Sequence, residues 1–374
     1  MRRFFRISFL AFVLVCLLSF SVNAEELNDL EDQINSLYGS LSSDVQEDLK
    51  SIGANKVDAL SLSEISFEAI MNLIFDKMSQ QSKGVLSSSA VVISILILNA
   101  LLDSYTDALK SSQMKEVLSV VSTLCITSTL VLPVIDLISD CILTVTDASN
   151  FMLLYIPIMV AILTLSGQAV TGASYYSFMV LACQGVSQIS SKFISPLLNV
   201  YLGFCVSSSI SKRVHLKGFC QMFSKIIKWL VAFTMTVFSA LMTIRGMITT
   251  AYDSVTARAV RFTMSSFIPI VGAALSESYK TIQGSINLLR TGAGVFVILA
   301  IAVVFIPVIV RCLLWMLSIN FCKSIGEVIG VTTQLNMLSS VSSVVSTIFA
   351  ITVCIMSVFI ISTALLITLG GGAH

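Results

Sequence analysis

The chain has 374 residues, of which 56% are hydrophobic and 11% are charged. A soluble domain carries roughly 25% charged residues, so this composition excludes an ordinary soluble enzyme and predicts a membrane protein. The formal net charge of +1 conceals an asymmetry: residues 25–83 hold twelve acidic and four basic residues, whereas residues 84–374 hold nine and fifteen. We therefore expect the acidic and the basic parts to face different compartments.

Residues 1–24 have the pattern of a secretory signal peptide. Three arginines near the start precede an apolar stretch from Ile7 to Phe20. Val22-Asn23-Ala24 then resembles a cleavage site with small residues. We expect cleavage after Ala24, with an uncleaved first helix as the alternative.

Residues 25–83 are predicted to form an exported acidic helical domain. Apolar residues recur at helical spacing in a first helix, at Leu27, Leu30, Ile34, Leu37 and Leu41. A second helix is predicted over about 63–80, preceded by a capping-box pattern of Ser61 and Glu64. The domain is interpreted either as two packed helices on the membrane surface or as a docking surface for a partner.

Residues 84–374 are predicted to be a polytopic membrane domain. Seven apolar segments are long enough to cross a hydrocarbon core, which needs about twenty residues. They lie near 84–102, 118–139, 151–170, 175–193, 194–211, 229–248 and 293–319, with an eighth near 344–369. The fourth and fifth could instead be one long element bent near Pro196. The predicted fold class is all-α: a polytopic transmembrane helical bundle with a short N-terminal exported helical domain.

A basic segment at 211–228 predicts which side faces the cytoplasm. It carries five cations and no acid, at Lys212, Arg213, Lys217, Lys225 and Lys228, with apolar residues between them at helical spacing. This pattern is typical of an interfacial helix on anionic lipid, and it offers a cytosolic partner contact. The stretch 140–150 holds two acids and no base, so the positive-inside rule places it on the other side. Nucleic-acid binding is not expected, because the chain is almost neutral overall.

A half-polar segment at 252–291 begins like a membrane helix and ends like a soluble surface. Residues 263–284 align with 151–172 at eight of 22 positions, which suggests an internal repeat. Half-polar elements at membrane depth line water or are buried in protein, so this one is a candidate route through the membrane. The alternative is an amphipathic helix outside the bilayer. The candidate pore or assembly residues are Pro157, Pro269, Gly272, Glu277, Lys280 and Gly284.

Two ionisable residues, Asp136 and Arg311, fall within apolar segments. A charge near the bilayer centre costs at least about 2.5 kcal/mol, so it usually faces water or a partner. One hypothesis is that Asp136 and Arg311 pair with each other. The alternative is that each side chain reaches the interface from a helix end.

The sequence gives no sign of catalysis. It has two histidines and no metalloprotease, nucleotide-binding or nucleophile-elbow motif. Its nine cysteines lie singly in or beside apolar segments, without the spacing of metal ligands. We expect neither an enzyme nor a cofactor or metal site.

The stretch TARAVRFTMSSFIPIVGAALSESYKTIQGS, from Thr256 to Ser285, resembles the signature region of the stage III sporulation protein AE family. The resemblance implies a component of the mother-cell-to-forespore channel apparatus, in the mother-cell membrane that surrounds the forespore. It also implies partners: the other stage III sporulation A proteins, including a cytosolic ATPase and ring-forming components, and a forespore channel protein. The N-terminal domain would lie in the intermembrane space, and loss of the protein would block late forespore gene expression.

The resemblance leaves three hypotheses for the role of the chain in the lipid membrane. It could be a channel or permease-like subunit, with homo-oligomerisation as an option. It could be a non-conducting assembly platform for the same complex. It could also be an independent secondary transporter, for which the repeat and the intramembrane charges would be the evidence.

Overall fold

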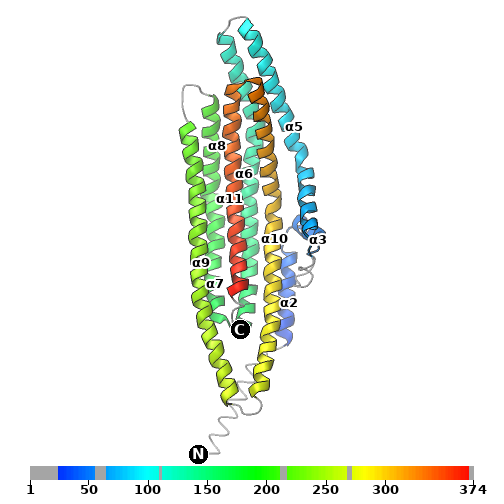
Figure 1. Cartoon of the computed structure of the whole chain (residues 1–374), viewed down its shortest axis with the longest axis vertical. Coiled ribbons are helices and arrows are strands. Elements are labelled where there is room, and N and C mark those ends of the chain that lie inside the picture. The colour runs from blue at the N-terminus through cyan, green and yellow to red at the C-terminus, as the bar shows by residue number, and fades with distance from the viewer. Residues whose placement is uncertain (1–23, 55–64, 109–111, 211–216, 268–271, 370–374) are drawn as a thin grey trace, which may run out of the picture.

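The structure is a computed structural model, and it describes residues 24–54, 65–108, 112–210, 217–267 and 272–369. These residues form helices without any strand, which confirms the predicted all-α fold (Figure 1). The helices are α2 Ala24–Gly39, α3 Ser43–Ser51, α5 Phe67–Ala108, α6 Ser112–Leu165, α7 Ala169–Ile189, the π-helix η1 Ser190–Ile194, α8 Ser195–Ile210, α9 Lys217–Phe267, α10 Gly272–Ile329 and α11 Thr332–Leu369.

The long helices form one elongated bundle in which successive passes run in opposite directions (Figure 1). The central helix is α11, which packs against α6, α8, α9 and α10. Its inward side chains are fully buried, among them Val341, Val344 and Ile348. By contrast, α9 lies at the edge of the bundle and exposes many large apolar side chains along its length. This arrangement suits a bundle whose outer surface meets lipid.

Six helical stretches in the described part of the chain are long and apolar enough to cross a membrane, rather than the seven or eight predicted. The segments 118–139 and 151–170 were predicted as separate spans, but 118–165 lies within the single helix α6. The intervening stretch 140–150 is therefore not a loop. It contains no Gly or Pro, and the hydroxyls of Thr146 and Ser149 bond to carbonyls four residues back, so its polar side chains do not break the helix.

The fourth and fifth predicted spans form one bent element, which confirms the alternative that the sequence left open. Helices α7 and α8 are joined by η1, where the Ser195 N–H bonds to the carbonyl of Ser190, five residues back. Pro196 follows directly. A proline ring clashes with the carbonyl four residues before it and lacks an N–H, so the helix widens here instead of continuing as a regular α-helix.

The helices are much longer than a bilayer is thick. Helix α6 has 54 residues, which corresponds to roughly 81 Å, whereas a hydrocarbon core is about 30 Å thick. Pro133 and Pro157 lie inside α6, and the helix continues past both of them. Hydropathy alone therefore cannot set the number of crossings, because one continuous helix contains two apolar segments of spanning length.

The N-terminal acidic helices pack against the side of this bundle. Leu37 of α2 and Leu49 of α3 are buried, and the ring of Tyr38 lies 6.4 Å from that of Phe296 in α10. An ion pair of 2.8 Å joins Asp48 of α3 to Lys77 of α5.

Helix α5 runs without a break through the boundary predicted at 83/84. Its first turn is stabilised by Ser66, whose Oγ accepts from the N–H of Ala69. The signal sequence and the predicted pair Ser61 and Glu64 lie outside the described residues.

The half-polar segment 252–291 is the end of α9 and the beginning of α10, two long helices that run in opposite directions (Figure 1). The suggested repeat has no structural counterpart. In 151–172 the chain turns at 166–168, whereas the aligned positions 278–280 lie within α10. The sequence match therefore reflects similar apolar composition rather than a repeated element.

Gly294 allows α10 to approach the end of α11 closely. A Cβ atom at this position would lie 2.5 Å from both Cδ1 and Cγ1 of Ile367. We expect Gly294→Ala to lower the free energy of unfolding by about 1–3 kcal/mol through overpacking. Ile367→Ala in the same chain should relieve part of this cost. Denaturant unfolding of the detergent-purified chain would measure both effects.

Gly284→Ala is the matched control, because a Cβ at Gly284 of the same helix would meet nothing within 4 Å. It should leave stability unchanged or slightly higher, since alanine favours a helix by up to about 1 kcal/mol over glycine. Equal destabilisation by the two alanine variants would contradict close packing at Gly294.

Candidate functional site

A polar pocket lies between α5, α6 and α10, midway along α6. Its volume is about 470 Å³. Its lining is formed by Gln80, Gln81, Gly84, Asp140, Leu143, Thr144, Asp147, Pro307, Val308 and Arg311. Three of these side chains are ionisable, in helices where charges are rare, and ionisable residues in spanning helices usually mark a functional surface.

The charged side of the pocket is an ion pair between Arg311 of α10 and Asp140 of α6. The exposed fractions of the two side chains are 31% and 37%, so the pair is only partly buried. The predicted partner of Arg311, Asp136, is exposed and does not line this pocket, so that pairing was wrong. The two aspartates are one turn apart on the same face of α6, and the level of α6 along its axis relative to α10 selects between them.

The opposite side of the pocket is formed by Gln81 of α5. Its Nε2 donates a hydrogen bond of 3.3 Å to the carbonyl of Pro307, while its Oε1 is buried without a hydrogen-bond partner among the described residues. Pro307 lies inside α10 and cannot donate a backbone hydrogen bond there. Gln81 thus ties α5 to α10 at the proline and adds an unpaired acceptor to the lining of the pocket.

The pocket is rich in acceptors and carries a net negative charge. Asp140 and Asp147 contribute two negative charges, and Arg311 contributes one positive charge. The described residues contain no group of three or more His, Cys, Asp or Glu side chains that could hold a metal ion. Such a pocket can hold water and polar or cationic solutes, but it shows no nucleophile held by a base.

The pocket also lies at a boundary in the polarity of α5. Residues 67–83 include Glu68, Asp76, Lys77 and Lys83, whereas residues 84–102 carry no charge. The acidic helices α2 and α3 pack beside the polar part, against α10 and α6. The pocket therefore lies where the bundle changes from a hydrophilic flank to an apolar one.

Of the other predicted pore or assembly residues, those whose side chains are described do not line this pocket. Pro157 is exposed on α6, and Gly284 is exposed on α10. Gly284 is 27 positions before Arg311 on the same helix, a distance of roughly 40 Å. Gly272, Glu277 and Lys280 belong to the first turns of α10, where only the backbone is described, and Pro269 lies outside the described residues.

The basic segment 211–228 is not a separate interfacial helix in its described part. Residues 217–228 are the first turns of α9. Lys225 is exposed, and Lys228 is half-buried with its Nζ 3.4 Å from the hydroxyl oxygen of Ser346 in α11. Lys212 and Arg213 lie outside the described residues, and for Lys217 only the backbone is described.

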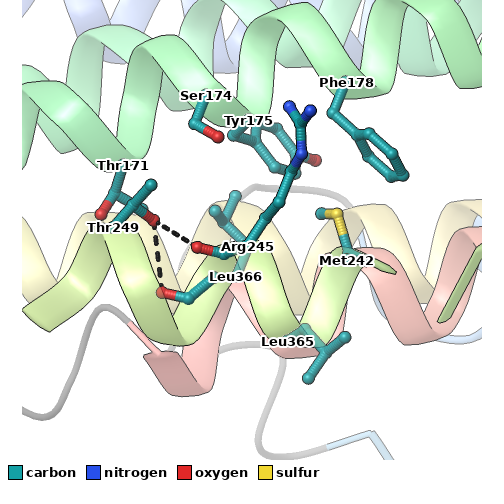
Figure 2. Close-up of a pocket in the computed structure, with 10 residues that line it drawn as sticks. Thr171, Ser174, Tyr175, Phe178, Met242, Arg245, Thr249, Leu365 and Leu366 are labelled. Atoms are coloured by element: carbon teal, nitrogen blue, oxygen red, sulfur yellow. Dashed lines mark hydrogen bonds between the residues drawn. The ribbon is translucent and has the colours of Figure 1, made fainter. Parts of the chain in front are cut away.

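A second pocket lies between α7, α9 and α11 (Figure 2). One of its lining residues, Thr171, bonds to an acidic residue that sequence reasoning missed. Asp253 of α9 is buried, and its carboxylate accepts the backbone N–H groups of Val170 at 3.3 Å and Thr171 at 2.8 Å. It thereby caps the start of α7, where Gln168 makes no side-chain capping bond. The available signal was an acid that closely follows the apolar stretch 229–248, at the start of the half-polar segment 252–291.

The same pocket contains Arg245 of α9, whose guanidinium lies 5.6 Å from the centre of the Phe178 ring (Figure 2). Thr249 lines the pocket too, but its hydroxyl bonds to carbonyls of its own helix. Tyr175 lines the inner part, and its hydroxyl is buried without a partner among the described residues. This second polar position is separate from the pocket at Arg311.

The fold and the placement of these charges define a multi-pass α-helical membrane protein. The sequence model of one family, stage III sporulation protein AE, matches residues 55–370. The chain belongs to this family, which is a family of sporulation membrane proteins.

One curated relative illustrates how far the similarity extends. The stage III sporulation protein AE of Bacillus subtilis (strain 168) is 22% identical over 223 residues, which cover 59% of this chain and 56% of the relative. The match thus spans little more than half of the length of that relative. No solved structure matches the chain.

Proposed function

We propose that this chain is a channel or permease-like subunit of the secretion-like complex that links mother cell and forespore. The single observation that carries the proposal is the partly exposed, negatively charged pocket at Asp140 and Arg311, where an apolar flank of the bundle meets a hydrophilic one. Ionisable side chains at such positions commonly line a solute path. In this role the protein supports late forespore gene expression and development.

The proposed route runs along the flank of the bundle rather than through its axis. The centre, where α6, α10 and α11 meet, is filled by buried apolar side chains such as Met159, Val297 and Ile348. The pocket is bounded only by α5, α6 and α10. A neighbouring copy of the chain, or another stage III sporulation A protein, would complete the wall.

We further propose an orientation with the basic end of the bundle in the cytoplasm. The end of α5 and the beginnings of α6 and α9 lie toward the same end of the bundle (Figure 1), and the sequence holds five cations in or next to them, Lys110, Lys115, Lys212, Arg213 and Lys217. The end of α9 and the beginning of α10 lie toward the other end and carry three, Arg258, Arg261 and Lys280. The positive-inside rule then favours a cytosolic basic end, where the ATPase partner would bind, and an intermembrane location for α2 and α3.

The alternative role is a non-conducting assembly platform. The observation that favours it is the docking of α2 and α3 on the side of the bundle, which presents an acidic surface next to the pocket. In this role the ring-forming components and the forespore channel protein would bind that surface, and the pocket would only be hydrated.

Cysteine labelling in sporulating cells can separate these roles. In a cysteine-free chain, single cysteines replace Gly84, Thr144 or Asp147 in the pocket, and Leu98 or Leu132 on exposed apolar positions of the same two helices as controls. We expect a membrane-impermeant maleimide to label the pocket positions and spare the controls. Labelling should also stop forespore reporter expression while the complex stays assembled.

Labelling at the pocket without any effect on the reporter would contradict conduction and favour the platform. Equal labelling of the pocket and control positions would contradict the assignment of the apolar flank to lipid.

A further inference from the structure

A second polar cluster, built around Arg290 of α10, is buried near the end of α11. Arg290 is 1% exposed, Tyr155 of α6 is 0% exposed and Tyr175 of α7 is 4% exposed. Arg290 and Tyr155 interact electrostatically, and Tyr155 interacts with Tyr175. Three helices thus bring one buried cation and two phenol groups together.

The positive charge of Arg290 has no carboxylate partner among the described residues. Its one hydrogen bond runs from a terminal nitrogen to the carbonyl of Ile367, at a long 3.4 Å. That carbonyl lies in the last turn of α11, which carries at most about half a negative charge. The cluster therefore lacks a full counter-charge. This is costly, because a buried charge without a partner is strongly destabilising.

The cluster also has unused hydrogen-bond donors. Arg290 Nε and the hydroxyls of Tyr155 and Tyr175 are buried without hydrogen-bond partners among the described residues. An arginine can only donate, and a phenol hydroxyl donates readily. A set of donors around a positive charge recognises a small anion.

The pocket in Figure 2 connects this cluster to its surroundings, because Tyr175 lines that pocket together with Arg245. Arg245 is exposed and adds a second positive charge on the outer side. The nearby acid, Asp253, accepts two backbone N–H groups of α7, so its charge is already compensated. The remaining polar groups of the pocket lining are hydroxyls, which do not repel an anion.

We propose that Arg290, Tyr155 and Tyr175 form a binding site for a small monovalent anion of the size of chloride. The anion supplies the counter-charge to Arg290 and accepts from the two tyrosine hydroxyls. It thereby joins α6, α7 and α10 around the end of α11. The proposal does not depend on whether the protein conducts.

Anion-dependent stability tests the site on the detergent-purified full chain. Chloride is replaced stepwise by gluconate at constant ionic strength, and the midpoint of thermal unfolding is recorded. We expect the midpoint to rise with chloride concentration and to saturate. Tyr155→Phe and Tyr175→Phe should each weaken the apparent chloride affinity at least about tenfold, the factor that corresponds to one lost hydrogen bond to a charged group.

Tyr201→Phe is the matched control, because the hydroxyl of Tyr201 donates to Ser343 at 2.9 Å in another part of the bundle. It should keep the chloride dependence of the native chain. Arg290→Met should abolish the dependence, and the two tyrosine variants keep the test decisive if Arg290→Met does not fold.

A midpoint that is the same in chloride and gluconate would overturn the proposal. So would a chloride dependence that Tyr155→Phe and Tyr175→Phe leave unchanged, because the anion would then bind elsewhere.

Discussion

Replacement of Asp253 by alanine is expected to lower the free energy of unfolding by about 2–4 kcal/mol, because one buried and one partly buried amide donor lose their acceptor. The carboxylate of Asp253 accepts from Val170 and Thr171 at the start of α7. It comes from α9, so its loss removes both a helix cap and a contact between helices. Denaturant unfolding of the purified chain in detergent would measure the loss.

Two variants make this prediction specific. Asp253→Asn keeps one acceptor oxygen and should lose less stability than Asp253→Ala. Thr256→Ala lies nearby on the exposed side of α9, where its hydroxyl bonds only to the carbonyl of Tyr252 in its own helix. It should change stability by less than about 0.5 kcal/mol. An Asp253→Ala chain as stable as Thr256→Ala would refute the capping role.

Reversal of either charge in the Asp140 and Arg311 pair is expected to destabilise the chain by about 1–3 kcal/mol. This range lies between the values for exposed and for fully buried pairs, as the partial exposure of both side chains requires. Asp140→Arg places two cations together, and Arg311→Asp places two acids together. The double reversal should recover most of the lost stability, because it restores the pair with the opposite polarity.

Asp136 provides the control for this experiment. Asp136→Arg combined with Arg311→Asp should not recover stability, because Asp136 is exposed and does not line the pocket. The yield of monodisperse protein after detergent extraction and the spore yield give two separate measurements. Recovery by the Asp136 combination instead of the Asp140 combination would show that α6 is shifted by about one turn along its axis relative to α10.

The ion pair of Asp140 with Arg311 and the polar cluster around Arg290 lie at different levels of the bundle. Arg311 and Arg290 lie on the same helix, 21 positions apart, or roughly 30 Å. Asp140 compensates the first charge, whereas the second has only the end of α11. Variants of the two arginines should therefore differ in their response to chloride: Arg311 variants keep the anion dependence, and Arg290 variants lose it.

Composition and hydropathy are enough to predict the class of the fold. A low content of charge and long apolar stretches predict membrane helices, because backbone groups in lipid must bond within their own segment. The basic and acidic segments predicted the uneven charge of the bundle, and the stretch from Thr256 to Ser285 led to the family. The same reasoning singled out Arg311 as a functional residue, because an arginine is costly in an apolar helix.

The packing of the helices determines which predicted spans merge and which side chains meet. Polar residues at 140–150 suggested a loop, but their hydroxyls bond within α6 and the helix continues. Asp136 and Asp140 differ by one turn, so the sequence gives both nearly the same direction, and packing of α6 against α10 selects Asp140. The contacts of Asp253 with α7 and of Arg290 with α11 join residues 77 or more positions apart. Such contacts depend on the rotation and level of packed helices, which hydropathy and local spacing do not encode.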